Sequence, residues 1–105
     1  MKPQEREEVI ELLKTVIYTF DWINFEDNLR DSRTHSFELQ SKNYWVDLEV
    51  EVTVEFESND FYEIDEIGLI DFAVFNRYGE TLVDADTLEQ HFTEDEIIDN
   101  LTIEV

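Results

Sequence analysis

The residues of this chain that could carry chemistry are its many acids and its two histidines. His91 and Asp95 stand four residues apart, a spacing that could place both on one helical face as metal ligands. Thr93 lies between them and is a preferred N-cap residue, so it predicts a helix start that separates the pair. The segment DADTLE at 84–89 partly matches a calcium-binding loop, but it lacks the third oxygen ligand and the glycine at position six. We therefore predict no metal site.

Catalysis is not predicted either. The chain has no cysteine, so it has no thiol nucleophile, and it has only two glycines, which excludes a glycine-rich phosphate loop. Paired carboxylates act as acid and base only in a cleft that moves their two pKa values apart. A domain of 105 residues leaves little room for such a cleft. We therefore expect a protein that is not an enzyme and uses no cofactor.

The strongest pattern is the stretch YWVDLEVEVTVEFES at 44–58. Its even-numbered positions from 44 to 56 are apolar and most of its odd-numbered positions are acidic, which predicts a β-strand with one buried face. Two acids in the next predicted strand extend the pattern. The residues expected on this acidic surface are Asp47, Glu49, Glu51, Glu55, Glu57, Glu63 and Asp65.

The charge of the chain is concentrated in the same region. Its formal net charge is −21, from 28 acids and 7 bases. Residues 1–42 hold six of the bases and nine acids, whereas residues 43–105 hold one base, Arg77, and nineteen acids. Binding to phosphates requires Lys and Arg, so we expect no direct contact with nucleic acid or with an anionic membrane. The expected partner is a basic protein surface.

A row of like charges is costly to build, because carboxylates directly opposite each other destabilise a sheet. A surface selected only for solubility would mix in lysines. Carboxylates on neighbouring strands are spaced on the same scale as the phosphates of duplex DNA. The sequence therefore favours a DNA mimic that occupies and inhibits the basic site of a nucleic-acid-binding enzyme. Trp45 is the expected anchor at that interface, and Tyr62 and Tyr78 are weaker candidates.

In size and charge the chain resembles the small acidic proteins that phages and mobile elements use against restriction, CRISPR or repair enzymes. It also resembles small acidic immunity proteins that neutralise nuclease toxins. These resemblances imply an inhibitory protein in the cytoplasm of a bacterial host. The alternative is a structural, assembly or adaptor protein, for instance in a virion, whose acidic face is only a solvated surface. We expect no membrane span, because no apolar run approaches about 18 residues.

The elements that must position these acids are predicted by periodicity. Apolar residues at helical spacing, after Pro3 at the expected first position, predict a helix over 4–20 that packs against the core. Residues 21–33 are ambiguous, with a turn expected at 31–33. Alternation over 34–41 and 44–57 predicts an antiparallel hairpin. The apolar helical positions are Val9, Leu12, Leu13, Val16, Ile17 and Phe20.

A third strand is predicted over 61–75, covered on both faces in its second half, where Gly68 marks a bulge or a close backbone approach. A short fourth strand is expected over 80–84. Capping-box patterns at Thr87 and Thr93 predict a helical turn at 87–92 and a helix at 94–101. The last four residues are expected to fray or to form a short edge strand. The predicted fold is a single two-layer α+β domain over 1–105, with an N-terminal helix, a four-stranded antiparallel sheet and a short C-terminal helix.

Overall fold

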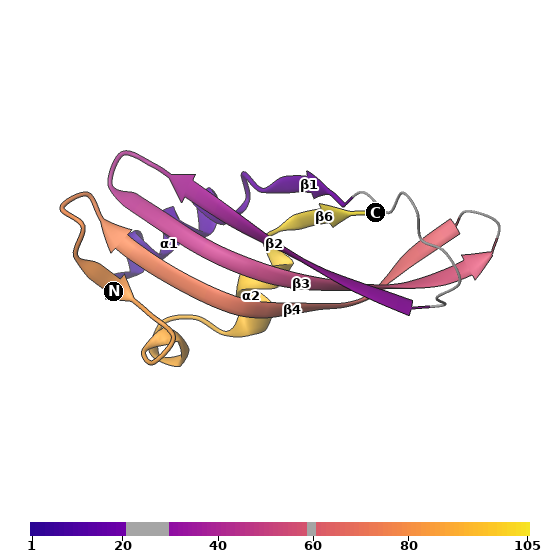
Figure 1. Cartoon of the computed structure of the whole chain (residues 1–105). Helices are drawn as coiled ribbons and strands as arrows, with labels where there is room; N and C mark the ends of the chain where they lie inside the picture. Colours follow the sequence, from indigo (N-terminus) through magenta and orange to yellow (C-terminus); the bar gives the residue numbers. More distant parts are fainter. Residues whose placement is uncertain (21–29, 59–60) are drawn as a thin grey trace.

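The computed structural model describes residues 1–20, 30–58 and 61–105, without the side chains of 30, 56–58 and 61. It has an N-terminal helix, a four-stranded antiparallel sheet and a short C-terminal helix, which confirms the predicted α+β class (Figure 1). In chain order the elements are α1 (Pro3–Leu13), β1 (Ile17–Thr19), β2 (Arg30–Gln40), β3 (Tyr44–Ser58), β4 (Phe61–Asn76), β5 (Thr81–Val83), the 3₁₀ turn η1 (Leu88–Gln90), α2 (Glu94–Asp99) and β6 (Thr102–Glu104).

The main sheet has the strand order β2-β3-β4-β5, with every neighbouring pair antiparallel. Its three long strands form a curved band, and α1, α2 and the small β1–β6 pair all lie behind this band (Figure 1). The molecule is elongated, with extents of 48 × 23 × 19 Å. One face of the long strands therefore packs against the second layer, and the other is turned away from it.

The alternation in β3 is observed as predicted. Val46, Val50, Val52 and Val54 have no exposed surface, and they form the centre of the core. The buried residues Val9, Leu12 and Leu13 of α1 belong to the same cluster, so this helix packs against the core as expected. Because side chains alternate along a strand, burying these valines turns the intervening acids of β3 outward.

The N-terminal helix is shorter than predicted, because α1 ends at Leu13 and the next residues form β1. Thr15 donates its hydroxyl to the carbonyl of Leu12 at 2.6 Å, and the β-branched residues that follow favour extended backbone. Strand β1 then pairs in parallel with β6, the tail that was expected to fray or to form an edge strand. Ile17, expected on the buried helical face, is 74% exposed.

The hairpin of β2 and β3 is present, but β2 begins earlier than predicted. Residues 31–33, expected as a turn, continue the ladder, with Asp31 opposite Val54 and Arg33 opposite Val52. Pairing with the long partner strand overrides the local turn preference of these polar residues. The ambiguous segment 21–29, including the apolar residues expected there, lies outside the described part of the chain.

Strand β4 contains irregularities in its pairing with β3. One of them falls between Glu49 and Val50, which pair with Asp71 and Leu69 and so leave Ile70 as the extra residue. Gly68 lies in the regular ladder opposite Glu51, with no atom within 4 Å of the position a Cβ would take, so it is neither the bulge nor a close approach. Ile70 is 51% exposed, and β4 is therefore not covered on both faces as predicted.

The C-terminal part of the structure agrees more closely with the prediction from the sequence. The Thr93 hydroxyl accepts a hydrogen bond from the Glu96 amide at 3.1 Å and caps α2, whereas Thr87 makes no such bond to η1. Arg6 of α1 forms an ion pair with Glu96 and joins the two helices. None of the helices in the described part of the chain has the length and apolar character to cross a membrane.

Candidate functional site

The outward side of the sheet collects acids from its three long strands. Residues paired across neighbouring strands project to the same side of a sheet, so the register with the outward residues of β3 identifies their neighbours. We call this surface the acidic face. It comprises Glu38 of β2, Asp47, Glu49, Glu51 and Glu55 of β3, and Glu63, Glu66 and Asp71 of β4.

Acids lie directly opposite acids on this face. Glu38 pairs with Asp47 across β2 and β3, and across β3 and β4 Glu49 pairs with Asp71 and Glu55 with Glu63. Such pairs destabilise a sheet, since each brings two negative charges to neighbouring positions. The salt bridges Arg6–Glu96 and Lys14–Glu11 lie away from this face, between α1 and α2 and at the end of α1.

Polar contacts within the face are few and come from neutral donors. Ser36 donates its hydroxyl to Glu49 at 3.1 Å, and the Trp45 indole N–H donates to Asp47 at 2.7 Å. Other positions on this side hold small or hydroxyl side chains, such as Thr34, Gly68 and Ala73, which stand opposite Glu51 or Asp47. A base also occurs in the register of this side, because Arg30 of β2 pairs with Glu55.

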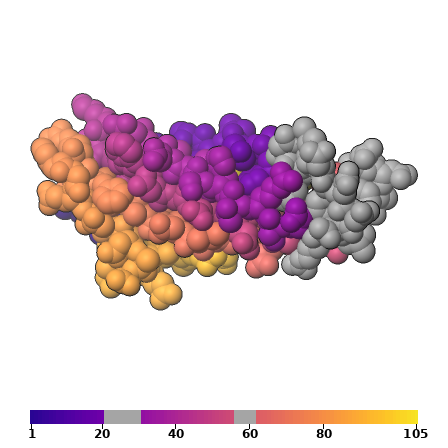
Figure 2. Space-filling model, in the orientation of Figure 1, coloured from indigo at the N-terminus to yellow at the C-terminus, as the bar shows by residue number. Residues whose placement is uncertain are grey.

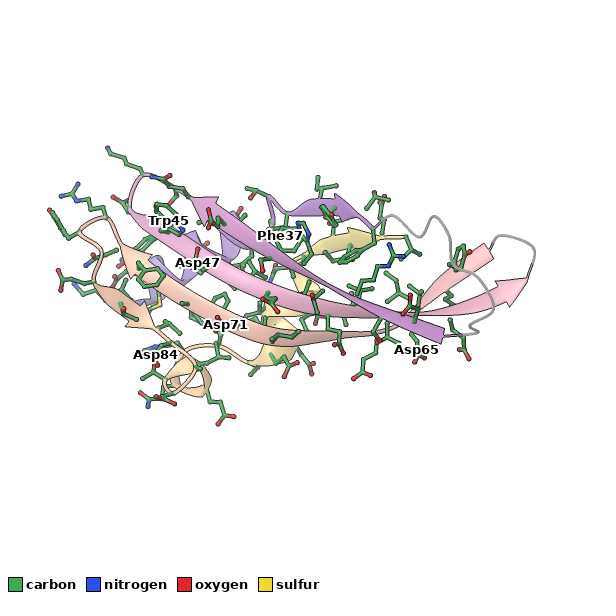
Figure 3. The ribbon with its side chains drawn as sticks, viewed as in Figure 1. Phe37, Trp45, Asp47, Asp65, Asp71 and Asp84 are labelled. Carbon is green, nitrogen blue, oxygen red and sulfur yellow. The ribbon has the colours of Figure 1, made fainter. Side chains whose placement is uncertain are left out.

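The predicted acids of the β3–β4 end come together. Glu55, Glu63 and Asp65 line a shallow hollow of about 180 Å³. Asp65 lies at an irregularity, between Ile64 and Glu66, and Figure 3 shows it far along the sheet from Asp47. Glu57 belongs to β3, but its side chain is outside the described residues.

The sequence prediction missed several acids of the face. Glu38 and Asp71 join Asp47 and Glu49 around a second hollow, of about 210 Å³, and the third missed acid is Glu66. Alternation in β2 carried the signal for Glu38, because His35, Phe37 and Leu39 occupy the alternate positions of this strand and so project to the opposite side. Asp71 was hidden in an apolar run whose period is broken by the extra residue of the bulge.

A groove of about 500 Å³ adjoins the acidic face where β2 meets β3 and β4 meets β5. We call it the Trp45 groove. Trp45, 42% exposed, stands opposite Phe75 in the register, and Tyr78 in the β4–β5 turn is 72% exposed. Tyr62, in contrast, packs against the core. The space-filling view shows the sheet face and this turn from the same side (Figure 2). The residues lining the groove include Lys42, Trp45, Asp47, Phe75, Arg77 and Tyr78.

Charges in the Trp45 groove are divided between its two sides. Arg77 lies over the Tyr78 ring at 4.9 Å and donates to the Tyr78 hydroxyl at 2.7 Å, so its guanidinium is held on the turn. Asp47 is held by the Trp45 indole on the sheet side. The groove thus has an acidic, aromatic side toward the sheet and a basic side toward the turns.

Two ionisable groups behind the sheet have shifted pKa values. The backbone N–H of Lys2 and the hydroxyl of Tyr44 both donate to Glu5, at 3.0 and 3.1 Å, and these bonds lower the pKa of the Glu5 carboxyl. Burial, followed by the bond to Glu5, raises the pKa of the Tyr44 phenol. This pair joins α1 to the start of β3 and is a structural contact, because Tyr44 is buried with the core.

The segments weighed for metal binding have other roles. His91 caps the end of η1, with its Nδ1 atom 3.2 Å from the amino group of Met1, and Asp95 lies in the first turn of α2. In 84–89 the Asp84 carboxylate accepts bonds from the amides of Asp86 and Thr87, which closes a turn. Within the described residues, no cluster of three or more histidines and acids could hold a metal ion.

Fold and site together define a small α+β protein in which one sheet face packs against helices and the other displays carboxylates. Comparison of the chain with protein-family models, with curated proteins and with solved structures finds no match.

Proposed function

We propose that this protein binds the basic nucleic-acid site of a partner protein through its acidic face, and inhibits that partner as a DNA mimic. The observation that carries the proposal is the register of like charges, with Glu38 opposite Asp47 and Glu49 opposite Asp71. Each such pair lowers the stability of the sheet, so solubility alone is a poor reason to keep it. Binding of a basic partner would relieve this repulsion, because its cations neutralise both members of each pair, and the relief would add to the binding free energy.

The dimensions of the face support a duplex-like footprint. Same-side residues of a strand repeat about every 6.8 Å, and neighbouring strands lie about 4.8 Å apart. Phosphates along one DNA strand advance by about 3.4 Å per step of the axis. From Asp47 to Glu55 the acids of β3 extend over about 27 Å, at about 3.4 Å per residue, which corresponds to about eight such steps. Carboxylates at these intervals would meet the lysines and arginines that line a DNA-binding groove.

The proposal predicts that reversing charges in the middle of the acidic face abolishes partner binding. We would change Glu49, Glu51 and Glu55 together to Lys and expect affinity to fall by more than about 10-fold, since a close interfacial charge pair is worth about 1.5 kcal/mol or more. The fold should persist, because these side chains point away from the core. The measurement is recovery of partners from a bacterial lysate at two salt concentrations, with competition by duplex DNA.

The matched control is a triple Lys variant of exposed acids outside the sheet, at Asp86, Glu89 and Asp99. It makes the same change in net charge and should retain the partners. Recovered nucleic-acid-binding proteins that are lost at high salt and displaced by DNA would support the mimic. Equal recovery by the face variant and the wild type would contradict it, and a salt-resistant partner would favour the structural or adaptor alternative.

A further inference from the structure

Trp45 is an exposed large aromatic side chain at the edge of the acidic face, and its indole N–H already has a hydrogen-bond acceptor. The indole N–H donates to Asp47 at 2.7 Å, so the ring is fixed in place by its own strand. Trp45 is 42% exposed, so the face of its indole ring remains available to a partner. Figure 3 shows Trp45 and Asp47 beside each other at one end of the sheet.

An indole face attracts cations, and it attracts a planar guanidinium in particular. The carboxylates needed to accept the guanidinium N–H groups are adjacent, because Asp47 bonds to the indole and Glu38 stands opposite Asp47 in the register. Ala73, opposite Asp47 on the other side, leaves this position open. An arginine could therefore stack on the ring and donate to carboxylates at the same time, which the compact ammonium of a lysine cannot do.

The rest of the groove limits where such a cation can lie. Lys42 and Arg77 line its other side, and the Arg77 guanidinium already stacks on Tyr78. A second cation is repelled from that side and directed toward Asp47 and Glu38. The Arg77–Tyr78 contact is also an example, within this chain, of the arrangement expected at Trp45.

We propose that the Trp45–Asp47 pair receives an arginine side chain of the basic partner, stacked on the indole and bonded to the carboxylates of Asp47 and Glu38. This inference rests on the proposed function, since it names the residue type that the partner supplies at one end of the acidic face. It makes that end selective for arginine, whereas the rest of the face responds to positive charge of either kind.

The test compares two labelled peptides of equal length and charge, one with arginine and one with lysine as its only basic residue, by fluorescence anisotropy at low salt. The wild type should bind the arginine peptide about 2- to 5-fold more tightly, the factor expected for cation–π stacking at an exposed site. In Trp45→Leu the arginine peptide should lose more affinity than the lysine peptide does, so that the two bind equally. Tyr78→Leu, which removes the other exposed aromatic of the groove, should retain the preference.

Each other result has a distinct meaning. Equal binding of both peptides by the wild type would overturn this inference while leaving the DNA-mimic proposal standing. Binding of neither peptide would remove the basis of both. The Trp45 indole resonance in an NMR spectrum gives a further check. If inorganic phosphate shifts this resonance and the arginine peptide does not, the groove binds anions through Lys42 and Arg77, and the inference is wrong.

Discussion

At the scale of single residues, the contact between Tyr44 and Glu5 couples protonation to stability. The pKa of the buried Tyr44 phenol is raised, so the folded state holds this proton more tightly than the unfolded chain does. The stabilisation linked to it is complete below the unfolded value of about 10 and is lost as the pH rises through the folded value. The effect therefore belongs to alkaline solution.

Replacing Tyr44 with Phe should remove the latest step from the alkaline titration of the protein's four tyrosines. The difference in unfolding free energy between wild type and variant should then shrink as the pH rises above about 10, because only the wild type has this proton to lose. Ultraviolet absorbance titration and urea denaturation measure the two effects. Tyr78→Phe is the control, since it removes an exposed phenol without touching Glu5; if it also removes the late step, the assignment to Tyr44 is wrong.

At the scale of elements, the like-charge register between strands should be measurable in isolation. Glu38→Lys turns a repulsive pair with Asp47 into an attractive one, whereas Glu51→Lys makes the same charge change opposite Thr34 and Gly68. We expect Glu38→Lys to stabilise the protein by about 0.2–1 kcal/mol more than Glu51→Lys does. Urea denaturation of both variants gives this difference. Equal gains would mean that net charge alone matters, and that the pairing does not.

The elements also show how far the sequence could predict this fold. Strand β3 was predictable because its period of two persists for its whole length, and the cap at Thr93 was predictable because it is local. The end of α1 was not predictable from the sequence. Val16 and Phe20 are buried, as a longer helix would also require, although both lie beyond the end of α1. The early start of β2 depends on pairing with distant residues of β3, which no local pattern contains.

The candidate site was predictable in part for the same reason. Alternation alone identified the acids of β3, and the register then added Glu38, Glu66 and Asp71. Asp71 could not be assigned to a side of the sheet beforehand, because the extra residue Ile70 shifts the phase of β4. The position of Trp45 beside Asp47 follows from their spacing on one strand, whereas the groove next to them requires the β4–β5 turn.

At the scale of the whole molecule, salt should act on stability and on binding in opposite directions. The screening length falls from about 30 Å at 0.01 M to about 3 Å at 1 M salt, which weakens repulsion across the acidic face and between the many other acids. We expect the free energy of unfolding to rise by about 1–3 kcal/mol over that range, as several cross-strand repulsions of about 0.2–1 kcal/mol each are relieved.

Urea denaturation in a sodium chloride series measures this rise, and partner binding in the same series should weaken, since it depends on the charges that salt screens. The triple Lys variant of Glu49, Glu51 and Glu55 serves as the comparison, with a smaller gain in stability from salt. An unfolding free energy that does not change with salt would show that the acids do not strain the folded state.

The placement of α1 and α2 behind the sheet has one more consequence, for the behaviour of many copies together. In the part of the chain that the structure describes, no second layer covers the front of the sheet, so another sheet could stack on it at about 10 Å, and in most proteins such a surface would promote precipitation. Here mutual repulsion between molecules keeps those surfaces apart at neutral pH. Near the sequence pI of about 4.1 the net charge falls to zero, and repulsion then no longer keeps the molecules apart.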